Sequence, residues 1–115
     1  MRQEMGKFGE ELAAQYLLSK EYRILLRNYR LRTGEIDIIC TKDDSIVFVE
    51  VKTRRSNRFG TPEEAVTKKK MAHIRQTALT YLAEQKSTYK QIRFDVIAIM
   101  LQEGPPLINH IECAF

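Results

Sequence analysis

The sequence predicts an α/β fold, a single mixed β-sheet flanked by helices, with elements in the order α-β-β-β-α-β and a short final strand. Three observations predict it. Apolar residues recur at helical spacing over residues 4–19 and 61–85. Runs rich in β-branched residues lie between and after these segments. Two of the runs are apolar at nearly every position, as in strands covered on both faces. A chain of 115 residues fits one domain, 1–115.

The first helix is predicted over residues 4–19 and is followed by a strand over residues 22–34. The helix is expected to bury one apolar stripe, formed by Met5, Phe8, Leu12, Tyr16 and Leu17. Gly6 and Gly9 have no side chain, so they would let this helix approach the sheet closely. The strand is predicted from the apolar and aromatic residues of YRILLRNYRLRTG.

The next segment, GEIDIICTKDDSIVFVEVKTR, predicts a β-hairpin with strands over residues 35–41 and 46–53. With the turn centred on residues 43–44, the numbers of opposed residues sum to 87. One face is then wholly apolar, with Ile36 opposite Val51, Ile38 opposite Val49 and Cys40 opposite Val47. The other face is apolar near the turn and charged at its far end, with Asp37 opposite Glu50 and Glu35 opposite Lys52. A slip of one residue would destroy this separation, so we expect this register.

The second helix is predicted over residues 61–85. Thr61 suits the N-cap, Pro62 suits the first helical position, and Glu64 completes a capping box. The expected buried stripe comprises Val66, Met71, Ile74, Ala78, Tyr81 and Leu82. A fourth strand, QIRFDVIAIML, is predicted over residues 91–101, and LINHIECAF over residues 107–115 is predicted to be a short final strand or a tail.

The charged end of the hairpin is the candidate site. Directly opposed Cβ atoms lie roughly 4.5–5.5 Å apart, so the carboxylates of Asp37 and Glu50 would repel each other. A divalent cation such as Mg²⁺ would offset this repulsion and would keep waters that phosphate oxygens can replace. Lys52 projects to the same face and could hold an attacking water or stabilise charge on phosphorus. The alternative is an ion pair of Glu35 with Lys52 at a solvated strand end.

Basic side chains cluster around this end of the hairpin. The formal net charge of +4 is compatible with a phosphate-rich partner. The candidate nucleic-acid-binding residues are Asn28, Arg30, Arg54, Arg55, Arg58, Lys68, Lys69 and Lys70. Clustered side chains of this kind bind phosphate backbones largely without sequence readout. For each cation alone, a solvated surface charge is the alternative.

Three other polar residues call for an interpretation. Asp95 is the one acid in the fourth strand, and we expect it to pair with a neighbouring arginine rather than join a metal shell. His73 and His110 are expected to be surface or structural residues. The chain shows no Ser/His/Asp set, nucleotide-binding loop or zinc spacing.

We expect a cytoplasmic protein that does not associate with membranes. Glu4, Glu10 and Glu11 interrupt the apolar pattern at the N-terminus, which disfavours a signal peptide. No apolar run approaches the roughly 20 residues needed to cross a bilayer. The two cysteines, Cys40 and Cys113, have no metal or redox spacing, so we expect reduced thiols.

The motifs GEIDII, VFVEVKTR and FGTPEEAV resemble the YraN-type family of small bacterial proteins. The resemblance covers most of the chain, from GKFGEELAAQYL through RNYR to RFDVIAI and the closing AF. That family looks like part of the restriction-endonuclease-like PD-(D/E)xK nuclease superfamily, akin to archaeal Holliday-junction resolvases. The resemblance therefore implies a restriction-endonuclease-like fold and a single nuclease-like domain.

The resemblance also assigns roles by position. Asp37 matches the superfamily's metal-binding aspartate, Glu50 its second acidic ligand and Lys52 its catalytic lysine. Glu10 matches an acidic residue that such resolvases bring to the metal from the first helix. From its helical position alone, Glu10 lies at the margin of the apolar stripe and fits a surface glutamate equally well. Ile36 stands where the superfamily name has proline, a residue that the metal chemistry does not use. The implied cofactor is Mg²⁺ or Mn²⁺.

Three functional hypotheses follow. The first is a metal-dependent endonuclease that hydrolyses phosphodiester bonds in structured or branched DNA, for which a two-fold substrate would favour a homodimer. The second is a non-catalytic nucleic-acid-binding module on the same scaffold. The third is a protein-interaction domain whose cations never meet phosphate.

Overall fold

The helices and strands occur in the predicted α/β order. The structure is a computed structural model that describes residues 2–55 and 66–115. Its elements are α1 (Arg2–Ser19), β1 (Arg23–Leu31), β2 (Gly34–Lys42), β3 (Ser45–Arg54), α2 (Lys68–Glu84), β4 (Gln91–Met100) and β5 (Leu107–Ile111). The strands form one five-stranded sheet in the order β1-β2-β3-β4-β5. The pair β3–β4 is parallel and the other pairs are antiparallel, so the predicted mixed sheet is confirmed.

The predicted register of the hairpin is confirmed along the paired part of β2 and β3. The paired residues run from Lys42 opposite Ser45 to Ile38 opposite Val49, and all of these pairs sum to 87. The pairing ends there, one residue before Asp37 and Glu50. The acidic positions therefore lie where the two strands begin to separate.

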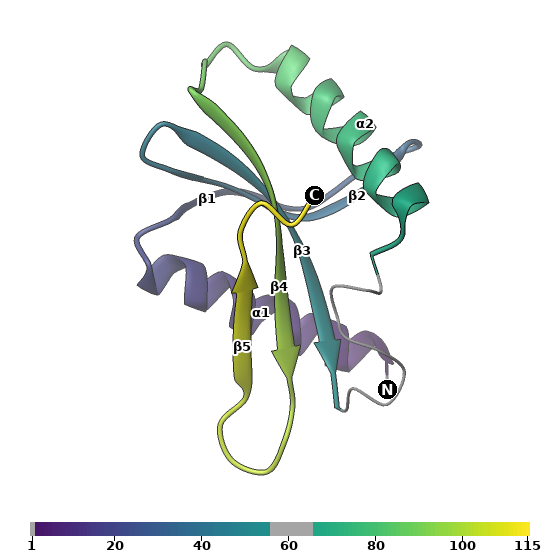
Figure 1. Ribbon diagram of the computed structural model, residues 1–115, viewed down its shortest axis with the longest axis vertical. Helices are drawn as coiled ribbons and strands as arrows, with labels where there is room; N and C mark the ends of the chain where they lie inside the picture. Colours follow the sequence, from purple (N-terminus) through teal and green to yellow (C-terminus); the bar gives the residue numbers. More distant parts are fainter. Residues whose placement is uncertain (1, 56–65) are drawn as a thin grey trace.

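A helix covers each face of the sheet (Figure 1). On one face α1 packs against β3 through a cluster that includes Ala13, Leu17, Val49 and Val51. On the other face α2 packs against β2 through a cluster that includes Ile39, Phe48, Ile74, Ala78 and Tyr81. Ile36 belongs to this second cluster, so its predicted place beside Ile38 is wrong. Past the end of the β2–β3 ladder, β2 is paired only with β1, so the predicted pairing with β3 no longer fixes which face each β2 side chain occupies.

The buried stripe of α1 differs from the predicted one. Phe8 is 53% exposed, whereas Ala13, Ala14 and Leu17 are buried. The helix approaches the sheet at Gly9, where an added Cβ would collide with the side chain of Thr53. Nothing lies within 4 Å of a Cβ at Gly6, so of the two glycines only Gly9 has the predicted close approach. Leu17 of the predicted stripe is buried, and Leu12 and Tyr16 pack against the same cluster, so the prediction fails at Phe8 and not along the whole stripe.

The start of α2 is also corrected. The helix that carries the stripe begins at Lys68, and Thr67 is its N-cap, accepting a hydrogen bond from the Lys70 backbone N–H at 3.1 Å. Val66 is buried but precedes the helix. The predicted capping box, Thr61 to Glu64, lies outside the described residues.

Within residues 2–55 and 66–115, neither helix is long and apolar enough to cross a membrane. Cys40 is buried and Cys113 is exposed, and both are free thiols.

Candidate active site

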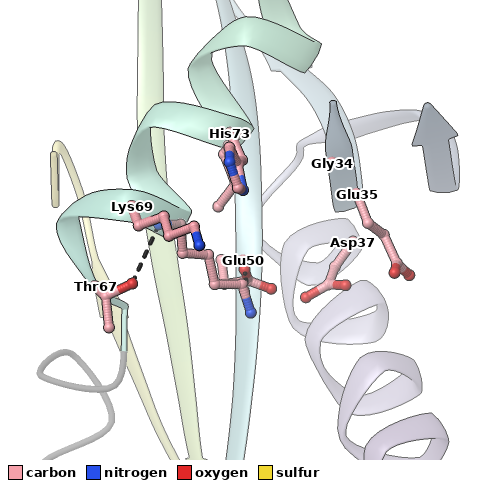
Figure 2. Close-up of a pocket in the computed structure, with 9 residues that line it drawn as sticks. Gly34, Glu35, Asp37, Glu50, Thr67, Lys69 and His73 are labelled. Atoms are coloured by element: carbon pink, nitrogen blue, oxygen red, sulfur yellow. Dashed lines mark hydrogen bonds and ion pairs between the residues drawn. The ribbon is translucent and has the colours of Figure 1, made fainter. Parts of the chain in front are cut away.

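Asp37 of β2 and Glu50 of β3 face each other at the point where their strands separate. The two side chains are buried, with 9% of Asp37 and 6% of Glu50 exposed. Asp37 Oδ2 accepts a hydrogen bond from the Val51 backbone N–H at 2.8 Å, which fixes its carboxyl group beside β3. Figure 2 shows the two carboxyl groups directed toward one another below His73 of α2. This convergence is the one that the hairpin register predicts.

The pairing of two buried acids perturbs their protonation. Burial raises the pKa of Asp37 well above its ordinary value, and a hydrogen bond with Glu50 and the Glu50 charge raise it further. The Val51 N–H opposes this shift only in part. Two adjacent buried carboxylates cannot both be charged at low cost unless a cation lies close by.

Lys70 of α2 supplies one cation. Its Nζ lies 3.1 Å from Glu50 Oε2. That oxygen is nevertheless the one buried side-chain oxygen or nitrogen in the described residues without a hydrogen-bond partner. The two observations agree if the contact is one of charge, in which the ammonium is near the oxygen but does not direct an N–H at it. Glu50 thus keeps an acceptor position free for another cation or donor.

Lys52 lies half-buried on the same strand as Glu50, two residues further on. Burial lowers the pKa of its amine, and the neighbouring Lys70 lowers it further, while the charge of Glu50 opposes the shift. Residues 50 and 52 share one face of β3, so the Lys52 amine lies on the face of the acidic pair. The alternative ion pair of Glu35 with Lys52 is not formed, because Glu35 contacts Arg30 Nε at 3.2 Å on the neighbouring strand.

Glu10 of α1 lies at the edge of the acidic pair. It is half-buried, and burial raises the pKa of its carboxyl group, as do the charges of Glu35 and Glu50. No three His, Cys, Asp or Glu side chains in residues 2–55 and 66–115 come close enough to form a metal shell by themselves. The structure therefore brings together Asp37, Glu50 and Lys52, with Glu10 nearby but not closing a three-acid shell.

The acidic pair opens into a cleft of about 380 Å³ between β2 and α2. Its lining residues are Gly34, Glu35, Asp37, Glu50, Thr67, Lys69, Lys70, His73 and Ile74. A hydrogen bond of 2.8 Å between the hydroxyls of Thr33 and Thr77 holds α2 over the start of β2. His73 is exposed, which confirms the prediction of a surface residue, and its side chain also lines this cleft. Its spacing of three residues from Lys70 was the signal, since such residues share a helix face.

The predicted nucleic-acid-binding residues are distributed around the cleft. Lys69 and Lys70 line it, and Lys68 is exposed in the same helical turn. Arg30 is exposed and paired with Glu35, whose side chain also lines the cleft. Of the others, Arg54 is half-buried at the end of β3, Arg55 and Asn28 are exposed, and Arg58 lies outside the described residues.

Asp95 does not belong to this site. It is fully buried and accepts hydrogen bonds from the Arg93 guanidinium at 2.7 Å and the Cys113 N–H at 3.1 Å. Its Oδ2 also lies 2.7 Å from His110 Nε2. Burial alone would raise the pKa of Asp95, but these partners outweigh burial and lower it. The predicted pairing with an arginine is confirmed, and His110 is a structural residue of this cluster.

The donor set of the acidic pair fits a hard divalent cation. Mg²⁺ binds few protein carboxylates and retains several waters, so two acids with an open side suffice. The free Glu50 oxygen and the raised pKa of Asp37 are what a site that lacks part of its positive charge would show.

Comparisons with known proteins identify one family. The uncharacterised protein family UPF0102 matches residues 9–99. A UPF0102 protein of Syntrophomonas wolfei is 54% identical over 115 residues, covering all of both chains. A UPF0102 protein of Alkaliphilus oremlandii is 51% identical over 117 residues, again covering both completely. One from Nocardia farcinica is 47% identical and covers 99% of this chain and 91% of its own length.

Proposed function

The chain belongs to the UPF0102 family, and from this premise and the geometry of the acidic pair we propose that it is a divalent-metal-dependent endonuclease. It would hydrolyse phosphodiester bonds in structured or branched DNA. The resemblance of GEIDII and VFVEVKTR to the PD-(D/E)xK nuclease superfamily supports the reaction class. A substrate with two-fold symmetry would engage two copies of the chain.

One observation carries the proposal. Asp37 and Glu50 are buried side by side, and within residues 2–55 and 66–115 Glu50 Oε2 has the Lys70 ion pair but no hydrogen-bond donor. Burying two adjacent carboxyl groups costs solvation, and the single ion pair of Glu50 with Lys70 offsets this cost only in part. A protein that needed only a stable sheet would gain from apolar residues at these positions. Retaining the pair is understandable if the two oxygens hold a cation.

The residues have distinct roles in this proposal. Asp37 and Glu50 would hold Mg²⁺ or Mn²⁺, together with the Val51 carbonyl, and Glu10 would contribute directly or through water. When bound, the metal supplies charge neutralisation at the phosphate and a more acidic water. The Lys52 amine, beside Glu50, would orient the attacking water and stabilise negative charge that develops on the phosphate oxygens.

Basic residues around the cleft would bind the DNA backbone. Lys68 and Lys69 at the start of α2 and Arg55 after β3 are exposed and free to meet phosphates. Arg30 would exchange its exposed ion pair with Glu35 for a phosphate at small cost, because exposed pairs contribute only about 0–1 kcal/mol. Asn28, Arg54, Arg58 and Lys70 complete the proposed set. Binding should weaken steeply with salt.

The test is a cleavage screen. Labelled linear, flapped and four-way DNA would be incubated with Mg²⁺ or Mn²⁺ and wild-type protein, Lys52→Ala or Lys86→Ala. Lys86 is exposed just after α2 and provides the same change of charge away from the cleft. Cleavage by wild type and Lys86→Ala, with loss of cleavage but not of DNA binding in Lys52→Ala, supports the proposal. Cleavage that survives Lys52→Ala would count against the assigned role.

A second candidate is a non-catalytic nucleic-acid-binding module. It is favoured by the contact of Lys70 with Glu50, since an internal cation can neutralise the acid without a metal. Calorimetric titration with Mn²⁺ separates the two functions. Metal binding that is lost in Asp37→Asn supports the endonuclease. DNA binding whose affinity is the same with and without metal supports the non-catalytic module.

A further inference from the structure

Lys70 is the one residue of α2 in ionic contact with the acidic pair among the residues that the structure describes. The N-cap Thr67 fixes the first turn of the helix by accepting from the Lys70 backbone N–H. The side chain then reaches down to Glu50, with 3.1 Å between Nζ and Oε2. Lys69, its neighbour in sequence, lines the same cleft without an ionic contact of this kind in the described chain.

The contact is built so that it can be exchanged. Glu50 is 6% exposed at its side chain, but Lys70 is 41% exposed, so the ammonium lies at the boundary with solvent. Within the part of the chain that the structure describes, the contact at Oε2 is an ion pair without hydrogen-bond geometry. A lysine has a flexible stem with several rotatable bonds, so its head can leave the acid without moving the helix.

We propose that Lys70 is the built-in counter-ion of the acidic pair, which a divalent cation displaces and whose ammonium then binds a phosphate of the nucleic acid. This inference rests on the proposed metal site, and it assigns Lys70 two successive partners. In the absence of metal the ammonium neutralises Glu50. When metal is bound, the same ammonium stands at the mouth of the cleft, where phosphates arrive.

The exchange has a thermodynamic consequence. A metal that must displace Lys70 binds more weakly than it would to the bare acids. Nucleic acid gives the displaced ammonium a new partner, so it should strengthen metal binding. By linkage, metal must strengthen nucleic-acid binding by the same factor. Metal and DNA would thus bind cooperatively, and the free protein would hold little metal.

The first experiment measures Mn²⁺ affinity without DNA, by isothermal titration calorimetry. Lys70→Met removes the charge at similar side-chain length. We expect it to bind Mn²⁺ roughly five- to tenfold more tightly than wild type. The reason is that the variant lacks the competing Lys70–Glu50 contact, which lowers the binding constant of wild type by about a factor of ten. Lys70→Arg keeps the charge and should resemble wild type. Lys86→Met makes the same change of charge at an exposed residue just after α2, outside the cleft, and should change affinity less than twofold.

The second experiment repeats the Mn²⁺ titration with saturating four-way DNA that carries nuclease-resistant phosphorothioate linkages. Wild type should gain affinity for Mn²⁺ when DNA is present. Lys70→Met should lose most of this gain while retaining DNA binding. Circular dichroism and thermal unfolding would verify that each variant is folded, and Mn²⁺ should raise the melting temperature of Lys70→Met more than that of wild type.

The results separate this inference from the proposed function. If wild type binds Mn²⁺ and Asp37→Asn does not, but folded Lys70→Met binds it equally or more weakly, the counter-ion role is overturned and the metal site stands. If Lys70→Arg behaves like Lys70→Met, the charge is not the cause and the inference also fails. If neither wild type nor Lys70→Met binds Mn²⁺, both proposals are overturned.

Discussion

Two clusters of buried acid lie on opposite faces of the same sheet, in neighbouring parallel strands. Asp95 of β4 pairs in register with Val49 of β3, and Glu50 is the next residue of β3. Asp95 faces α1 and is surrounded by donors from Arg93, His110 and Cys113. Glu50 faces α2 beside another acid, and one of its oxygens has no hydrogen-bond donor among the described residues. The Asp95 cluster is satisfied by donors of the chain itself. The acidic pair keeps one carboxylate oxygen without a hydrogen-bond donor in the described residues.

The contrast separates an acid with a structural role from one for which we propose a function. Burial costs both acids solvation, which Asp95 recovers through several hydrogen bonds and Glu50 through one ion pair with Lys70. Strongly perturbed groups in clefts gather at functional sites, although structural ion pairs also perturb pKa values. Here the direction of the pKa shift distinguishes the two clusters, because the pKa of Asp95 is lowered and that of Asp37 is raised.

The largest expected effect is on the complete cluster. Asp95→Ala would leave the Arg93 guanidinium, 15% exposed, without its buried partner. Removing one member of a buried pair costs about 3–5 kcal/mol. We expect urea denaturation to show a loss of this size, or a failure to fold. Asp44→Ala, which alters an exposed acid in the β2–β3 turn, is the control and should change stability little. A loss below about 1 kcal/mol would contradict the structural role of Asp95.

A smaller effect is expected where α1 approaches the acidic pair. Gly9→Ala would drive a methyl group into Thr53 and push α1, which carries Glu10, away from β3. Overpacking of this kind costs about 1–3 kcal/mol. Gly6→Ala has open space, so it should instead stabilise the helix by up to about 1 kcal/mol.

Thermal unfolding of these two glycine variants would measure both effects. If Glu10 contributes to the site, only Gly9→Ala should also weaken Mn²⁺ binding. Equal stability of the two variants would show that the close approach of α1 is not needed.

The fold was predictable because it follows from local patterns, whereas the partners of the acids depend on distant residues. Alternation along β2 and β3 was enough to set the register that places Asp37 near Glu50. The cluster around Asp95 includes His110 and the backbone of Cys113, which no local pattern connects to it. The exposure of Phe8 was missed because periodicity identifies a helix face but not the close contact at Gly9 that rotates it.

The two clusters should also respond to pH in opposite directions. The lowered pKa of Asp95 means that its contribution to stability is present above the unfolded value, about 4, and is lost as pH falls through the folded value. The raised pKa of Asp37 means that the unfolded chain releases this proton first, so stability falls as pH rises from about 4 upward.

Asp37→Asn should therefore reduce the fall in the free energy of unfolding that occurs as pH rises toward neutral, by at most about 1.4 kcal/mol for each pH unit. Denaturation at a series of pH values without metal would measure it. The same slope in wild type and Asp37→Asn would contradict the raised pKa.

The smallest effect is expected at the incomplete cluster. Glu50→Gln removes a buried charge next to another acid and should change stability by about 1 kcal/mol or less, with a gain favoured, since functional sites often sacrifice stability. The same substitution should abolish Mn²⁺ binding, which calorimetry would measure. A loss of stability as large as that of Asp95→Ala would remove the distinction between the clusters.

The alternation of side chains along β3 carries a last consequence. Val49 and Glu50 differ by one position and serve opposite faces. Inserting or deleting a single residue in this strand would exchange the surroundings of both, burying a carboxylate against α1 and an aliphatic group in the cleft. Insertions and deletions in β3 should therefore prevent folding even where point substitutions do not. A library of one-residue insertions and deletions would identify this strand as the segment in which no such variant folds.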